Sequence, residues 1–168
     1  APAHEIVPLC DHLRNCGAVR SRNPPQLRRQ ALGRVLRAAP ERIERHHPSP
    51  RRLKTLIEEL EAESHVRLGA LLDPANFIAN SDEEGMFYYL KHDVSYFHGK
   101  DRKINATYGV NVGDGDIDWV KFMECYLRYT PKKPFILEYC NKDNCAEIKR
   151  RAEDYSDQAF QVLLSRVN

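Results

Sequence analysis

Three side chains that can bind a divalent metal ion each follow a short apolar run in this sequence. Asp73 follows the run GALL, His98 follows VSYF, and Glu138 follows FIL. Short apolar runs separated by helical segments are typical of parallel strands in an α/β sheet. Catalytic groups of such sheets gather at the carboxyl ends of the strands. A carboxylate, an imidazole and a second carboxylate at three strand ends therefore form a candidate metal or acid/base site.

The elements that must position these residues alternate along the chain. From about residue 41 we expect the order helix, strand, helix, strand, helix, strand, helix, with right-handed connections between parallel strands. The expected strands are residues 67–72, 93–97 and 135–138. Capping residues predict four helix starts, at Ser49 before Pro50, at Ser81 with Glu84, at Asp116, and at Asn144 with Glu147.

Composition indicates a globular protein of one α/β domain. The chain has 168 residues, 42% hydrophobic and 30% charged, with a net charge of +2. It has no apolar run near the roughly 18 residues of a membrane-spanning helix, and its first ten residues lack the pattern of a secretory signal. Five irregularly spaced cysteines predict reduced thiols and a cytoplasmic location. We therefore expect neither a membrane nor a nucleic acid as a partner.

The first part of the chain differs in composition from the rest. Every strongly basic residue before Lys54 is an arginine. Residues 26–39 carry arginines on one face of an expected helix, with no aromatic residues among them, which favours a solvated face over a nucleic-acid site. We predict an Arg-rich helical or irregular segment over residues 1–40 and a separate α/β region over residues 41–168.

Four ordered motifs resemble one known family. LLDPANF, FHGKD, GDGDIDW and FILEYC are similar to the second half of the sugar phosphate isomerase/epimerase family, also called AP endonuclease family 2. The resemblance spans roughly residues 48–155, about two-thirds of the chain. It implies the xylose isomerase-like TIM barrel, with about the last four βα units of that barrel in residues 41–168.

The resemblance also implies a metal centre. The family binds one divalent ion, commonly Mn, Mg, Co or Zn, through a Glu, an Asp, a His and a Glu. The last three correspond to Asp73, His98 and Glu138. The first Glu belongs to an E-N-H motif, and the corresponding stretch here reads RIERHHPSP. Glu44 would then be the fourth ligand and His46 the motif histidine, with an arginine in place of the asparagine.

By the same resemblance, the chain would be a metal-dependent isomerase or epimerase of a small sugar or polyol. Glu44 and Glu138 would be the catalytic acid/base pair that moves a carbon-bound proton through an enediolate-like intermediate. Asn76, Lys100 and His46 would contact the substrate. The resemblance therefore extends the metal site into a proton-transfer site.

Two of the motif residues also have a structural interpretation. Lys100 could form a salt bridge to Asp101 instead of contacting a substrate. Trp119 is expected in the core, between helix and sheet, and not as a platform for a sugar ring.

Other functions remain open on the sequence alone. A keto-inositol-type dehydratase would use related metal chemistry. An AP endonuclease is disfavoured because the stretch YGVNVGDG lacks the histidine that those enzymes carry before this loop. A truncated or degenerate barrel half that binds a ligand or partner without turnover is the main alternative.

The chain supplies too few strands for a closed barrel. A complete barrel has eight strands and about 250 residues, whereas this sequence predicts three strands and a more polar fourth near residues 41–47. The open sheet edge needs a cover. The chain could be a fragment of a full barrel, two copies could pair as a homo-oligomer, or the Arg-rich segment could cover the edge.

Overall fold

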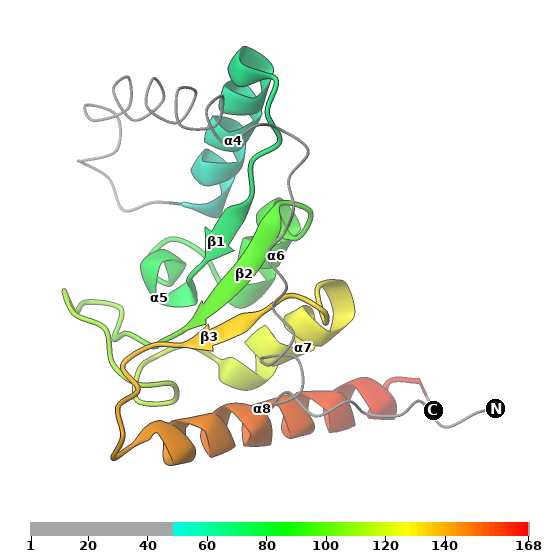
Figure 1. Cartoon of the computed structure of the whole chain (residues 1–168). Helices are drawn as coiled ribbons and strands as arrows, with labels where there is room; N and C mark the ends of the chain where they lie inside the picture. The colour runs from blue at the N-terminus through cyan, green and yellow to red at the C-terminus, as the bar shows by residue number, and fades with distance from the viewer. Residues whose placement is uncertain (1–48, 168) are drawn as a thin grey trace.

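A parallel sheet of three strands forms the centre of the protein in the computed structural model of the chain (Figure 1). The structure describes residues 49–167. The strands β1 (Ala70–Leu72), β2 (Val94–Gly99) and β3 (Phe135–Leu137) lie in the order β1-β2-β3. Both pairs are parallel, as the βαβ pattern predicted. All three carboxyl ends therefore lie at the same edge of the sheet.

Five helices accompany this sheet in the described part of the chain. They are α4 (Pro50–Ser64), α5 (Pro74–Phe77), α6 (Glu83–Leu90), α7 (Trp119–Tyr129) and α8 (Cys145–Ser165). Helix α4 packs against α6, α6 against α7, and α7 against α8. Among residues 49–167, no helix combines the length and the apolar content needed to cross a membrane.

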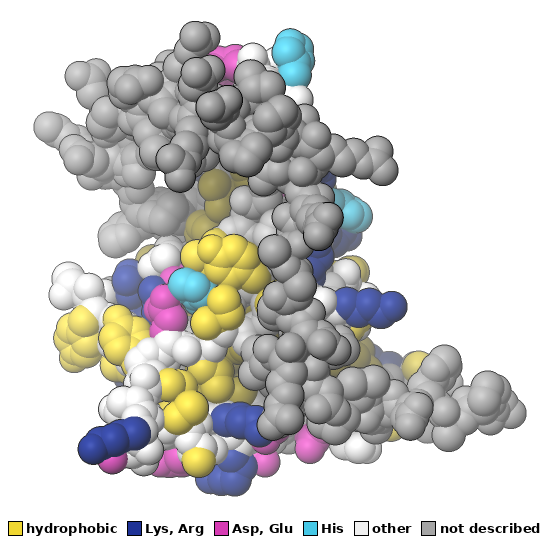
Figure 2. Space-filling view, viewed as in Figure 1, with side chains coloured by type: hydrophobic (Ala, Val, Ile, Leu, Met, Phe, Trp, Pro, Cys, Tyr) yellow, Lys and Arg dark blue, Asp and Glu magenta, His cyan; other side chains and the backbone are white. Residues whose placement is uncertain are grey.

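The two faces of the sheet differ in what covers them. Leu72, Phe97 and Phe135 are in register across the three strands and are buried. Tyr96 and Ile136 belong to the opposite face and are 37% and 43% exposed. The helices therefore cover one face, while the other bears exposed apolar side chains. Figure 2 shows a histidine and acidic side chains bordered by hydrophobic side chains.

Aromatic side chains fill the space between the sheet and the helices. The Phe122 ring of α7 lies 5.1 Å from Phe87, 5.9 Å from Phe97 and 5.3 Å from Trp119, measured between ring centroids. All three pairs have edge-to-face geometry, the arrangement that the ring quadrupoles favour. Trp119 is buried, so its predicted place in the core is confirmed. This packing fixes β2, which carries the histidine of the site.

The helix starts differ from the predictions at two acidic positions. The predicted start at Ser81 with Glu84 is wrong, because Asp82 caps α6 and its carboxylate accepts the Gly85 N–H at 2.8 Å. The predicted cap at Asp116 is also wrong. Asp116 accepts the Ile104 N–H at 2.9 Å, and a later aspartate, Asp118, caps α7. At α6 the Asp82 carboxylate is a stronger acceptor than the Ser81 hydroxyl, and at α7 the Asp116 carboxylate is already engaged by the loop before the helix.

The other two predicted starts fall at the observed positions. The Ser49 hydroxyl accepts the Arg52 N–H at 3.2 Å and caps α4. Asn144 is the first flanking residue of α8, but its side chain makes no capping bond. The side-chain carbonyl oxygen of Asn144 instead accepts the Asn141 N–H at 2.7 Å and closes the turn before the helix. Glu147 therefore does not complete a capping box with it.

The α/β class and the order of elements agree with the sequence prediction. Three βα units lie within the described residues, and the strands are shorter or shifted relative to the predicted ranges. The first strand begins at Ala70 and not at Arg67, because the Leu68 N–H binds the Glu61 carboxylate at 2.6 Å. The more polar strand predicted near residues 41–47 and the boundary near residue 40 lie outside the described residues.

Candidate metal centre

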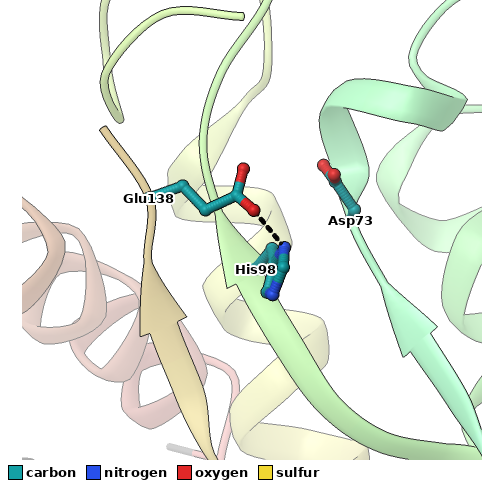
Figure 3. Close-up of side chains that lie close together, drawn as sticks. All are labelled: Asp73, His98 and Glu138. Carbon is teal, nitrogen blue, oxygen red and sulfur yellow. Dashed lines mark ion pairs between the residues drawn. The ribbon is translucent and has the colours of Figure 1, made fainter. Parts of the chain in front are cut away.

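Asp73, His98 and Glu138 come together at the carboxyl edge of the sheet. One ligand atom from each residue lies within 4.8 Å of the other two. Asp73 directly follows β1, His98 lies near the end of β2, and Glu138 directly follows β3. In Figure 3 Glu138 and His98 point toward each other, and Asp73 lies across from them. Two carboxylates and one imidazole form a donor set that suits Mn, Co, Zn or Mg.

Helix α5 fixes the orientation of Asp73. Asp73 caps this helix, with Pro74 in the first turn, and its Oδ1 accepts the Ala75 N–H at 3.1 Å. Its Oδ2 accepts the side-chain amide of Asn76 at 2.9 Å. Burial raises the pKa of the Asp73 carboxyl, and the ammonium of Lys100 offsets part of that shift. The sequence DPAN therefore orients a buried carboxylate. Asn76 supports it, and its predicted contact with a substrate stays a prediction.

His98 and Glu138 form a direct contact across β2 and β3. The distance from His98 Nδ1 to Glu138 Oε1 is 2.5 Å. Both side chains are partly exposed, at 21% and 29%, so the pair opens toward solvent. A divalent ion that binds both of these atoms would replace their contact with each other. The pair can therefore either keep this contact or bind an ion.

Lys100 joins the two carboxylates. Its Nζ lies 2.7 Å from Asp73 Oδ2 and 3.0 Å from Glu138 Oε2. Burial lowers the pKa of the Lys100 ammonium, but the hydrogen bonds to both carboxylates raise it by more, so the net shift is upward. The alternative salt bridge to Asp101 is wrong, because the Asp101 carboxylate faces the loop on its other side.

Asp101 holds the loop beside the site, a role that the sequence analysis missed. Its carboxylate is fully buried. It accepts N–H groups from Arg102 at 2.8 Å, Gly113 at 3.1 Å and Ile117 at 3.2 Å, and the Trp119 indole N–H at 2.8 Å. An aspartate directly before a glycine-rich loop was the available signal, because such loops present N–H groups that need an acceptor.

Gly99 separates His98 from Lys100 and has no room for a side chain. A Cβ atom there would overlap the Phe135 ring and lie 2.9 Å from Leu137 Cδ2. We expect Gly99→Ala to lower the free energy of unfolding by about 1–3 kcal/mol, measured by urea denaturation. Gly85→Ala is the control, since its Cβ would meet the rotatable ends of the Ser81 and Asp82 side chains and not a packed ring, and alanine favours a helix. Equal stability of the two variants would contradict the crowding at Gly99.

The remaining predicted site residues divide into two groups. Asn76 and Lys100 lie at the site through their contacts with Asp73. Glu44 and His46 lie outside the described residues, so the fourth ligand and the partner in the acid/base pair stay predictions.

Comparisons with known proteins give a match in structure only. No family model matches the sequence, and no curated protein matches it. A xylose isomerase domain protein from Alicyclobacillus acidocaldarius subsp. acidocaldarius matches over 69% of this chain and 47% of its own, with 22% identity and a TM-score of 0.55. A xylose isomerase domain protein from Planctomyces limnophilus matches over 71% and 41%, with 19% identity and a TM-score of 0.48.

The match to the Alicyclobacillus acidocaldarius protein bears on the fold. The chain spans less than half the length of each of these two proteins. The first of them carries the comparison, since its TM-score of 0.55 is the higher. The three-stranded parallel sheet with its helices is consistent with part of a TIM-barrel-like fold. The resemblance to xylose isomerase-like proteins that the motifs predicted is therefore confirmed at the level of the fold.

Proposed function

We propose that this chain carries the metal centre of an isomerase or epimerase that acts on a small sugar or polyol. The observation that supports this most is the convergence of Asp73, His98 and Glu138 within 4.8 Å, at the edge where α/β sheets place their chemistry. The fold shared with a xylose isomerase domain protein agrees with it. Because the chain spans 47% of that protein's length, the match does not extend to the substrate or the activity of a complete barrel, and both are part of this proposal.

The chemistry requires a base beside an electron-withdrawing group. A divalent ion at this site would polarise a substrate carbonyl and make the neighbouring C–H more acidic. Glu138, partly exposed and next to His98, would take that proton and return it to the adjacent carbon, or an acid on the other side of the substrate, predicted to be Glu44, would protonate the opposite face of the same carbon. The first outcome is isomerisation and the second is epimerisation. Lys100 would neutralise negative charge on a substrate oxygen.

Exchange of the α-proton into heavy water tests this proposal. The purified chain is loaded with Mn²⁺ or Co²⁺ and incubated with a panel of ketoses in D₂O, and deuterium incorporation is followed by NMR. We expect exchange with at least one ketose, and a decrease of about 100-fold or more in Glu138→Gln. Glu124→Gln is the matched control, because Glu124 forms an ion pair with Arg166 away from the site.

Other results would point to other functions. If the purified chain binds neither Mn²⁺ nor Co²⁺, the proposed metal centre is wrong. If it binds metal but exchanges no proton, the site would bind a ligand or partner without turnover. Loss of water from a cyclic keto substrate would indicate a dehydratase.

A further inference from the structure

Lys100 occupies the position where two carboxylates from different strands meet. Its ammonium contacts one oxygen of Asp73, at 2.7 Å, and one oxygen of Glu138, at 3.0 Å. Its side chain is 15% exposed, so these ion pairs are largely withdrawn from water. Lys100 directly follows the central strand β2, and its side chain contacts Asp73 after β1 and Glu138 after β3. A single positive charge thus already holds two of the three candidate metal ligands.

The carboxylate oxygens at the site each have a hydrogen-bond partner. Asp73 Oδ1 accepts the Ala75 N–H, and Asp73 Oδ2 accepts from both Asn76 and Lys100. Glu138 uses Oε1 for His98 and Oε2 for Lys100. A divalent ion bound to both carboxylates would therefore compete with this network. The Ala75 contact belongs to the helix cap, so the long and flexible lysine side chain is the partner that can leave most easily.

Charge also favours the departure of the lysine. The two carboxylates carry two negative charges, and Lys100 compensates one of them. A divalent ion would place two further positive charges within a few ångströms of the ammonium, whose side chain is 15% exposed. Like charges at that separation repel more strongly in a partly buried site than in bulk water. Simultaneous binding of the ion and of the ammonium to the same oxygens is therefore disfavoured.

We propose that Lys100 is a built-in competitor of the metal ion: its ammonium holds Asp73 and Glu138 together when no ion is bound, and it leaves them when an ion binds. This proposal rests on the metal centre of the proposed function and adds a role for a residue outside the ligand set. The released ammonium would be free to meet a substrate oxygen. Lys100 would then link metal loading to readiness for substrate.

Metal affinity provides the first test. Mn²⁺ is titrated into the metal-free chain and into Lys100→Met, and the dissociation constants are measured by calorimetry. We expect Lys100→Met to bind Mn²⁺ at least about tenfold more tightly, because no ammonium has to be displaced. Lys121→Met is the matched control, since Lys121 pairs with the exposed Glu84 on the surface of α6 and α7. Its affinity should equal that of the unmutated chain.

A second measurement uses the unmutated protein and does not depend on the folding of a variant. Lysine side chains are dimethylated with formaldehyde and a borohydride reagent, with and without saturating Mn²⁺, and the modification of each lysine is followed by mass spectrometry. We expect Lys100 to be protected without the ion and to react several times faster with it. Lys121 should react at the same rate in both conditions.

The outcomes separate this inference from the proposed function. If the unmutated chain does not bind Mn²⁺, the metal centre itself is wrong. If it binds Mn²⁺ but Lys100→Met binds no more tightly, or if Lys100 stays protected in the presence of the ion, the competition is wrong and the metal centre stands.

Discussion

Replacement of Asp101 by alanine is expected to lower the free energy of unfolding by about 4 kcal/mol or more. The carboxylate of Asp101 is fully buried and accepts four N–H groups. Three of these are backbone amides from the loop before α7, and the fourth is the Trp119 indole. Alanine would leave all four donors without this acceptor, and the Ile117 N–H and the Trp119 indole N–H are buried. A buried donor without a partner destabilises the fold by more than the loss of a surface contact.

Equilibrium urea denaturation of the two proteins measures this effect. Asp114→Ala is the control within the same loop, because the Asp114 side chain is 45% exposed and binds Arg151 at the surface. We expect that variant to lose no more than about 1 kcal/mol. A loss of similar size in both variants would mean that the four hydrogen bonds of Asp101 are not what stabilises the loop.

The second large effect concerns metal binding. Asp73→Asn is expected to weaken the binding of Mn²⁺ by about 100-fold or more, because an amide oxygen lacks the charge of the carboxylate. The amide can still accept the Ala75 N–H, so the cap of α5 is retained and the fold should change little. Calorimetric titration of the metal-free protein gives the two dissociation constants.

Asp82→Asn is a closely matched control for Asp73→Asn. Asp82 also caps a helix, and its Oδ1 accepts the Gly85 N–H at 2.8 Å, but it is not part of the metal-competent cluster. The same substitution there should leave the affinity for Mn²⁺ unchanged. Equal affinities of Asp73→Asn and the unmutated chain would remove Asp73 from the ligand set.

The strand ends were the part of the site that the sequence could predict. In a parallel sheet the carboxyl ends lie at one edge, so the residue that follows each apolar run has a known location. Asp73, His98 and Glu138 converge for that reason. The apolar pattern also predicted where the strands lie along the chain, because each strand is a short apolar run.

The hydrogen-bond partners could not be predicted in the same way. Lys100 and Asp101 are neighbours in the sequence, and a local salt bridge between them was a reasonable alternative. Lys100 and Asp101 directly follow β2, and neighbouring side chains of an extended backbone point to opposite sides, so Lys100 reaches the carboxylates while Asp101 faces the loop and the Trp119 indole. The partners of Asp101 depend on which N–H groups of a distant loop segment lie near its carboxylate. The spacing of residues in the sequence does not show this.

The order β1-β2-β3 separates the two carboxylates of the site by a whole strand. Strands β1 and β3 share no hydrogen bonds with each other, and each has only three residues. An ion bound by both Asp73 and Glu138 would connect β1 and β3 directly, across the central strand β2. Hydrogen exchange of the backbone amides of β1 and β3 would then become slower in both strands when the ion binds. Metal binding at this centre would therefore stabilise the sheet.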